Sequence, residues 1–156
     1  MKTIIMYATK YGAAGEIARR IANKIDGAVV HDLKQGNDPS LADFDCVIIG
    51  SSLYVGMIRR EAKAFLSRNA SALRGKKVGL FLCGLESTGG KKCFDANFPP
   101  DILQTAKAMS FLGGIFDPGK AGVMDRFMIK MAAKQSKFIN TIDDEKIEQF
   151  VEAMKA

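Results

Sequence analysis

Residues 3–15 read TIIMYATKYGAAG, and this stretch decides the fold. Residues 4–8 form a continuous apolar run, which is typical of a central parallel strand covered on both faces. Residues 17–25 then carry isoleucine at every fourth position, which gives one apolar stripe along a helix that begins near Gly15. The polar turn between them, residues 9–14, therefore joins the end of a buried strand to the start of a helix.

Strand and helix patterns alternate along the rest of the chain. Further strands are predicted at residues 28–33, 45–50, 77–83 and 110–116, and the polar residues of the first of these indicate an edge strand. Helices are predicted at residues 62–73, 102–109 and 123–134, and after Thr141 as an N-cap. Asp38-Pro39 looks like a helix start, but little of a helical pattern follows it. Residues 84–98 are predicted to form a long polar loop.

This alternation favours an α/β fold with a doubly wound, five-stranded parallel sheet in the order 2-1-3-4-5 and helices on both faces. In such a sheet the ligand site lies at the carboxyl ends of the first and third strands. The turn at residues 9–14 lies at one of these two strand ends.

Composition bounds what the chain can be. Its 156 residues predict one domain, residues 1–156, and 47% hydrophobic with 26% charged residues is ordinary for a globular protein. The three cysteines, Cys46, Cys83 and Cys93, include no Cys-x-x-Cys pair and predict free thiols in a reducing compartment. The sequence shows no signal-peptide pattern and no apolar run of about 18 residues, so we expect a cytoplasmic protein without a transmembrane segment.

The chain is basic, with a net charge of +6 and a pI of about 9.3, and its cations concentrate in residues 59–77 and 120–137. This bias suits nucleic acid, anionic lipid or an anionic small molecule. Nucleic acid is disfavoured because no nucleic-acid motif is present and aromatic residues are few. Residues 123–131 are apolar with spaced cations, which indicates either a helix packed on the sheet or a surface that touches a membrane, a quinone or a large apolar substrate.

The turn after the first strand has the residue types of an anion site. Unpaired N–H groups at a helix start attract anions, and the helix dipole strengthens the attraction. Gly12 allows a tight turn, Thr9 and Tyr11 can donate hydroxyl hydrogen bonds, and Lys10 adds positive charge. The turn suits a phosphate monoester, with a plain strand-to-helix turn as the alternative. Its spacing matches neither the P-loop nor the dinucleotide glycine motif.

A second polar stretch, GSSLYVG at residues 50–56, follows the third strand. It is expected to lie beside the first turn, because the carboxyl ends of parallel strands meet at one edge of the sheet. Tyr54 offers a stacking surface for a planar aromatic ligand, and the alternative for this residue is an aromatic side chain packed under a loop.

Together the two stretches resemble those of flavodoxins, and the resemblance covers the whole chain. It implies a flavodoxin-like fold with FMN as cofactor: residues 9–14 look like the phosphate loop, residues 51–56 like the ring-and-ribityl loop, and residues 84–90 fall where the third flavin loop lies. The cofactor-binding residues that the resemblance implies are Thr9, Lys10, Tyr11, Gly12, Ala13, Ala14, Ser51, Ser52, Leu53, Tyr54, Val55, Gly56, Gly84, Leu85, Glu86, Ser87, Thr88, Gly89 and Gly90.

The segment MDRFMIKMAAK, residues 124–134, is more particular. It is similar to a segment of the flavodoxin-like, quinone-dependent protoporphyrinogen dehydrogenases of bacteria. That resemblance implies an oxidoreductase of heme biosynthesis that takes hydrogen from protoporphyrinogen and passes electrons to a quinone. The flavin would carry the chemistry, without a catalytic side chain or a metal. Cations that could pair with porphyrinogen carboxylates are Arg59, Arg60, Lys91, Lys92 and Arg126.

The chain departs from the flavodoxin pattern in two places. Ala14 stands where a second hydroxyl residue is usual and Tyr11 where a smaller hydroxyl residue is usual, so phosphate binding is expected to weaken by roughly 0.5–1.5 kcal/mol for each lost hydrogen bond. The third loop lacks the aromatic residue that many flavodoxins place over the outer face of the ring.

Two other functions stay open. One is a flavodoxin-type electron carrier between redox proteins, against which the basic charge argues, and the other is a flavodoxin-like binding domain without FMN. The single histidine, His31, is expected to be structural because no partner is apparent in the sequence.

Overall fold

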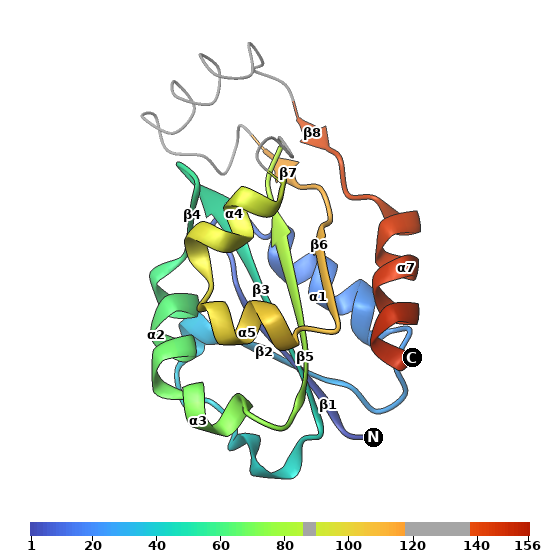
Figure 1. Ribbon diagram of the computed structural model, residues 1–156. Helices are drawn as coiled ribbons and strands as arrows, with labels where there is room; N and C mark the ends of the chain where they lie inside the picture. Colours follow the sequence, from blue (N-terminus) through green and yellow to red (C-terminus); the bar gives the residue numbers. More distant parts are fainter. Residues whose placement is uncertain (86–89, 118–137) are drawn as a thin grey trace.

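The computed structural model describes residues 1–85, 90–117 and 138–156, and five parallel strands form the centre of this part of the chain (Figure 1). They are β1 (Thr3–Ala8), β2 (Val29–Asp32), β3 (Cys46–Tyr54), β5 (Lys77–Cys83) and β6 (Ala108–Phe111). The strands lie in the order β2-β1-β3-β5-β6, and each neighbouring pair is parallel. The α/β fold and the strand order predicted from the sequence are confirmed, with β2 at an edge.

β1 lies between β2 and β3, and its side chains enter two separate cores. Ile4 is opposite Val29 of β2 and Val47 of β3. Ile4 packs in the core on one face of the sheet and Ile5 in the core on the other, and both are fully buried. Because both faces are covered, every position of β1 favours an apolar residue, which explains the uninterrupted run in the sequence.

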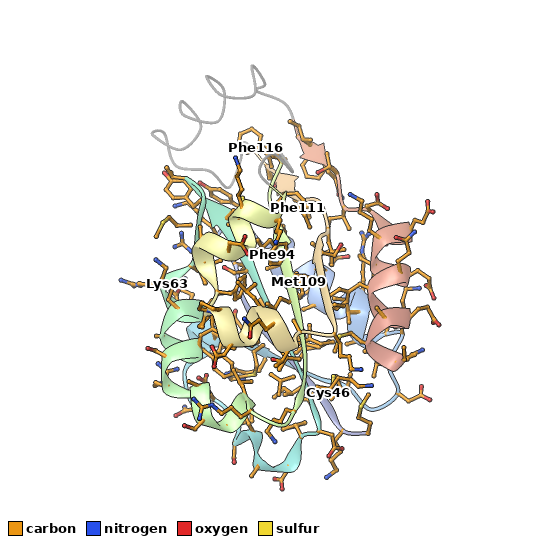
Figure 2. The ribbon with its side chains drawn as sticks, in the orientation of Figure 1. Cys46, Lys63, Phe94, Met109, Phe111 and Phe116 are labelled. Carbon is orange, nitrogen blue, oxygen red and sulfur yellow. The ribbon has the colours of Figure 1, made fainter. Side chains whose placement is uncertain are left out.

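Helices cover both faces of the sheet (Figure 1). On the face of Ile5 lie α1 (Ala13–Ala22) and α7 (Asp144–Lys155). On the face of Ile4 lie α2 (Arg60–Arg68), α3 (Ala70–Leu73), α4 (Gly90–Asn97), α5 (Pro100–Thr105) and the short 3-10 helices η1 (Leu33–Gln35) and η2 (Leu41–Asp43). Phe94 of α4 and Phe111 of β6 pack in this second core (Figure 2).

At the centre of the sheet, Gly50 of β3 leaves room for an aromatic ring of β5. A Cβ atom on Gly50 would lie only 2.0 Å from Cζ of Phe81, its register partner. The Phe81 ring in turn meets Phe150 of α7 edge to face, with 6.3 Å between the ring centroids. Glycine at position 50 is therefore required by the packing of β5 and α7 against β3.

Several predicted boundaries in the second half of the chain are wrong. Residues 90–97, predicted as part of a polar loop, form α4. The helix predicted to reach Met109 ends at Thr105, and Met109 lies in β6. The predicted fifth strand is divided, because the chain turns at Gly113 (φ 89) and continues as β7 (Ile115–Phe116), which pairs antiparallel with β8 (Ile139–Asn140).

Helix ends also differ from prediction. α1 begins at Ala13 and ends at Ala22, earlier than expected at both ends, and the N-cap of α7 is Asp143 in place of Thr141. Asp38-Pro39 starts no helix, and Ser40 instead caps the short η2. The helix predicted at 123–134 lies outside the described residues. None of the helices within the described ranges is both long and apolar enough to cross a membrane.

Candidate functional site

The first candidate loop joins β1 to α1. Gly12 is the N-cap of α1 and has φ 98, in the left-handed region that favours glycine. Its backbone N–H donates a hydrogen bond to Oγ1 of Thr9 at 2.9 Å, which closes the turn. A Cβ atom on Gly12 would meet no atom within 4 Å, so the space in front of the helix is open. The first-turn N–H groups of an α-helix have no intrahelical partner, so this turn fits an anion.

The two alanines after Gly12 belong to the helix. Ala13 and Ala14 are both buried, at 5% and 0% exposed, and both pack in the core beneath α1. Next to them, Gly15 lies close to β1, where a Cβ atom would be 3.1 Å from the ring of Tyr7. The methyl group of Ala14 therefore packs in the core.

The second candidate loop is a β-hairpin. β3 continues to Tyr54, so Ser51 to Tyr54 extend the strand that the sequence predicted to end at Gly50. β4 (Met57–Ile58) pairs antiparallel with the end of β3, and the turn between them consists of Val55 (φ 52) and Gly56 (φ 73). Positive φ at both turn residues is typical of two-residue hairpin turns. This backbone conformation is strained for a β-branched residue such as Val55.

Two contacts join the first loop to the hairpin. The backbone N–H of Lys10 donates a hydrogen bond to Oγ of Ser52 at 3.0 Å. The Nζ atom of Lys10 lies 3.8 Å from the ring centroid of Tyr54 and 5.6 Å from that of Tyr11. The structure thus brings together the residues of the two loops at the carboxyl ends of β1 and β3.

The third candidate loop follows β5. Gly84 donates its backbone N–H to the carbonyl of Gly113 at 3.0 Å, and a Cβ atom on Gly114 would lie 2.6 Å from the carbonyl oxygen of Gly84. Gly84 and Leu85 are described, and Gly90 begins α4. Glu86, Ser87, Thr88 and Gly89 lie outside the described residues.

Asn97 of α4 supports the hairpin, and sequence reasoning missed it. Its Oδ1 accepts a hydrogen bond from the N–H of Ile58 at 2.9 Å, and its Nδ2 donates to the carbonyl of Gly56 at 3.0 Å. The side chain is buried, at 8% exposed. Its signal in the sequence is weak, because the buried face of α4 consists of Phe94 and the polar Asn97 itself.

Four of the five candidate substrate cations are described, and they lie at the start of α2 or of α4. Arg59 precedes α2, donates its N–H to Oγ of Ser51 at 2.9 Å and is partly buried, whereas the side chain of Arg60 is 92% exposed. Lys91 and Lys92 are exposed in the first turn of α4. Arg126 lies outside the described residues. The three exposed cations of this group are therefore open to an anionic ligand from solvent.

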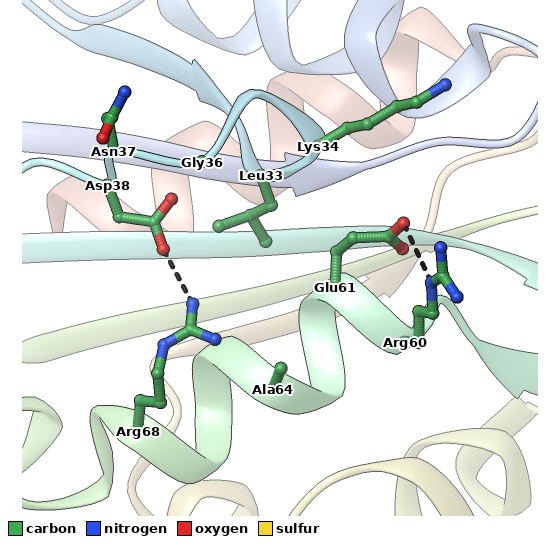
Figure 3. A pocket seen from close by; sticks show the side chains of 9 residues that line it. All are labelled: Leu33, Lys34, Gly36, Asn37, Asp38, Arg60, Glu61, Ala64 and Arg68. Carbon is green, nitrogen blue, oxygen red and sulfur yellow. Dashed lines mark hydrogen bonds and ion pairs between the residues drawn. The ribbon is translucent and has the colours of Figure 1, made fainter.

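An open groove of about 660 Å³ runs between the segment after β2 and α2 (Figure 3). Its lining residues are Leu33, Lys34, Gly36, Asn37, Asp38, Arg60, Glu61, Ala64 and Arg68. Asp38 pairs with Arg68 at 2.9 Å, and Nε2 of His31 lies 3.0 Å from Oδ1 of the same carboxylate. His31 therefore has a partner in the structure that is not apparent in the sequence. The groove shares only Arg60 with the candidate residues above.

The thiols of Cys46 and Cys83 are buried and are not poised for nucleophilic chemistry. Burial raises the pKa of Cys83, and burial also raises the pKa of Cys46, so both remain protonated. Cys93 is partly buried against the core beneath α4. Across residues 1–85, 90–117 and 138–156, His, Cys, Asp and Glu nowhere form a group of three or more that could hold a metal ion.

Strand order, the anion-type turn and the adjacent hairpin together define a flavodoxin fold. Residues 4–141 match the flavodoxin-domain family, and the chain belongs to this family. It is also similar to the protoporphyrinogen IX dehydrogenase (quinone) of Escherichia coli strain K12, with 24% identity over 149 residues, 87% of this chain and 81% of that protein covered. The resemblance stated from the sequence is confirmed.

Solved structures share the fold. A flavodoxin of Streptococcus pneumoniae TIGR4 superposes with a TM-score of 0.64 at 18% identity, with 99% of this chain and 98% of that chain covered. A flavodoxin of Fusobacterium nucleatum bound to flavin mononucleotide superposes with a TM-score of 0.52 at 20% identity, with 69% and 68% covered.

Proposed function

We propose that this chain is a single-domain, FMN-binding oxidoreductase of the flavodoxin type. One observation carries the proposal: the hydrogen bond from Lys10 to Ser52 joins the anion-type turn of α1 to the hairpin that carries Tyr54. The two loops follow adjacent parallel strands, β1 and β3, at the edge where ligands bind in doubly wound sheets. The FMN-bound flavodoxin of Fusobacterium nucleatum, which shares the fold, supports the choice of cofactor.

Each loop has a role in this proposal. Residues 9–14 hold the phosphate through the backbone of the turn and the first turn of α1, where Gly12 leaves open space. Residues 51–56 hold the ribityl chain and the ring, with Tyr54 as the stacking residue. Residues 84–90 complete the site. When bound, FMN supplies the redox chemistry, and the residues of the chain bind and orient it.

We propose that the substrate is protoporphyrinogen and that the electrons taken from it pass to a quinone. The similarity to the E. coli enzyme over most of both chains supports this choice. The exposed cations Arg60, Lys91 and Lys92 can pair with the carboxylates of a porphyrinogen, and Arg126 joins them by resemblance. The protein would then work in the cytoplasm, in reach of quinone at the inner face of the membrane.

Cofactor binding is tested first, by titrating FMN fluorescence with the purified protein. We expect quenching at micromolar concentration with one FMN per chain. Absence of quenching and of flavin absorbance would overturn the proposal and leave a flavodoxin-like binding domain without FMN.

The substrate is tested with anaerobic protoporphyrinogen and a quinone acceptor, since oxygen oxidises the porphyrinogen without an enzyme. Arg60→Glu is the informative variant because its side chain is 92% exposed, so the change does not disturb the core. We expect a higher KM with FMN still bound, and a wild-type rate that falls with salt because exposed charges are screened over about 10 Å at 0.1 M. Lys63→Glu is the matched control, since Lys63 points away from the protein one turn along α2 (Figure 2).

A second candidate function is electron transfer between proteins. The hairpin tip exposes two apolar side chains, Val55 at 70% and Met57 at 48%, beside the proposed ring site. Apolar side chains at such a tip suit contact with a protein partner. An FMN-loaded protein that reduces a ferredoxin-type partner but does not oxidise porphyrinogen would favour this carrier function.

A further inference from the structure

The groove between the segment after β2 and α2 has two ends of different chemistry (Figure 3). At one end both oxygens of the Asp38 carboxylate are occupied. Its Oδ2 accepts a hydrogen bond from Arg68 at 2.9 Å, and Nε2 of His31 lies 3.0 Å from its Oδ1. The negative charge at this end is therefore already paired, and the pairing holds the segment after β2 against α2.

The other end of the groove carries two cations. Lys34 is exposed and makes no hydrogen bond or ion pair with another residue that lines the groove (Figure 3). The side chain of Arg60 is 92% exposed, and its Nε lies 3.6 Å from Oε1 of Glu61, which is too far for a hydrogen bond. Two cations and one acid thus leave an excess of positive charge at this end.

This cationic end lies at the carboxyl edge of the sheet. Lys34 comes two residues after Asp32, the last residue of β2 and the register partner of Tyr7 in β1. Arg60 begins α2, directly after the hairpin strand β4 and Arg59. The proposed flavin loops follow β1 and β3 at the same edge. The two cations therefore lie at the edge of the sheet that carries the proposed cofactor site.

We propose that the cationic end of the groove binds a carboxylate of the tetrapyrrole substrate, with Lys34 and Arg60 as its partners. This inference rests on the proposed function and deepens it, because it gives one substrate carboxylate a defined place. It also adds Lys34 to the cations considered above. Lys34 belongs to η1 and Arg60 to α2, so the carboxylate is held from both walls of the groove.

The chemistry of the lining selects this kind of ligand. Hydrogen bonds from a cation to a carboxylate are roughly twice as strong as neutral ones. Arg60 offers a planar fork of donors, and Lys34 offers three donors on a flexible stem. Leu33 and Ala64 add apolar surface to the lining. A tetrapyrrole carries its carboxylates on short, flexible side chains at the rim of a large ring. One such side chain can enter an open groove of about 660 Å³ while the ring stays outside.

Binding of protoporphyrin, the oxidised form of the proposed substrate, tests this site without turnover. Its fluorescence is titrated with the purified protein, beside that of its dimethyl ester, which has the same ring and no free carboxylate, in the same detergent. We expect Lys34→Met to weaken protoporphyrin binding roughly fivefold, the upper range for one exposed charge pair, and to leave binding of the ester unchanged. Lys63→Met is the matched control, since Lys63 points away from the protein on α2 (Figure 2), and should change neither affinity.

Glu61→Gln should change the affinity in the opposite direction. Glutamine keeps the shape of the side chain and removes the negative charge at the cationic end, so protoporphyrin should bind roughly threefold more tightly. Binding of the ester should stay the same. Glu152→Gln, at an exposed acid of α7, controls for the change in net charge. Circular dichroism shows whether each variant is folded.

Several results would overturn the proposal. One is wild-type protein that binds protoporphyrin no more tightly than the ester. Another is an effect of Lys63→Met as large as that of Lys34→Met, which would indicate general attraction to a basic surface. Unchanged or weaker protoporphyrin binding to Glu61→Gln would overturn it as well, because loss of the acid has to favour a carboxylate bound at this end.

The groove assignment and the proposed function fail separately. If wild type oxidises protoporphyrinogen under anaerobic conditions but Lys34→Met and Glu61→Gln leave protoporphyrin binding unchanged, the groove assignment is wrong and the proposed function stands. If both variants change protoporphyrin binding as expected but the FMN-loaded protein does not oxidise protoporphyrinogen, the proposed function is wrong and the groove remains a carboxylate site.

Discussion

The side-chain carbonyl of Asn97 accepts a hydrogen bond from the backbone N–H of Ile58 at 2.9 Å. The amide nitrogen of the same side chain donates to the carbonyl of Gly56 at 3.0 Å and to that of Cys93, one turn back in α4, at 2.7 Å. One buried side chain therefore joins the turn and β4 to α4. Tyr54 of β3 pairs with Met57 of β4, so we expect its position to depend on this connection.

Asn97→Ala tests this dependence. The change leaves the N–H of Ile58 without its partner, and an unsatisfied buried donor costs about 1–3 kcal/mol. The carbonyl of Gly56 loses its bond to Asn97 as well. We expect a lower free energy of unfolding in urea together with weaker FMN binding. Asn69→Ala is the control, because the Asn69 side chain donates to the carbonyl of Phe65 in α2, away from the hairpin. Equal loss of FMN affinity in the two variants would show that the hairpin does not need Asn97.

Val55, at the tip of the hairpin, is expected to lower the melting temperature of the protein. Its φ of 52 is disfavoured for a β-branched residue by roughly 1–2 kcal/mol, and its side chain is 70% exposed, so little packing is lost on replacement. Val55→Asn should raise the melting temperature, because asparagine tolerates this backbone conformation. Val55→Ile keeps the strain and should give no gain. Equal melting temperatures for Val55→Asn and Val55→Ile would contradict the role of backbone strain at this position.

Gly50→Ala is expected to destabilise the sheet. The new Cβ atom would lie 2.0 Å from the Phe81 ring, and overpacking of a core typically costs about 1–3 kcal/mol. Phe81→Leu removes the atoms that clash, so the double variant should lose less stability than the two single variants added together. Additive losses in urea denaturation would show that β3 and β5 separate instead of clashing.

The ion pairs of Glu16 in α1 are expected to make the free energy of unfolding depend on pH. Hydrogen bonds from Arg20 and then from Arg19 lower the pKa of Glu16 from its ordinary value. Because this pKa is lower in the folded than in the unfolded chain, the contribution of Glu16 is present above the unfolded pKa and is lost as pH falls through the folded pKa. The side chain is 35% exposed, so solvent screening limits the contribution to about 0.2–1 kcal/mol.

Glu16→Gln should therefore reduce the free energy of unfolding at neutral pH and have no effect once Glu16 is protonated in the folded wild type. Glu152→Gln, at an exposed residue of α7, serves as the control in the same series of urea titrations. A difference between Glu16→Gln and wild type that is the same at every pH would contradict this account.

The strand order and the first two loops could be predicted because the sequence marks them strongly. Apolar runs such as residues 46–49 are fully buried in the sheet, and polar residues follow them where the strands end. α4 was missed because its buried face consists of Phe94 and the polar Asn97, which gives no apolar stripe. The partner of His31 was missed because the chain reverses at Gly36 and Asn37, both with positive φ, and brings Asp38 back to β2.

The pairing of β7 with β8 has a consequence for how α7 is held on the sheet. Phe116 of β7 lies opposite Ile139 of β8, and the backbone N–H of Thr141 donates to the carbonyl of Gly114 at 2.8 Å. The backbone N–H of Asp143, the N-cap of α7, donates to the carbonyl of Leu112 at 3.1 Å. Main-chain groups thus anchor the entry to α7, and such bonds are compatible with many different side chains at Thr141 and Asp143.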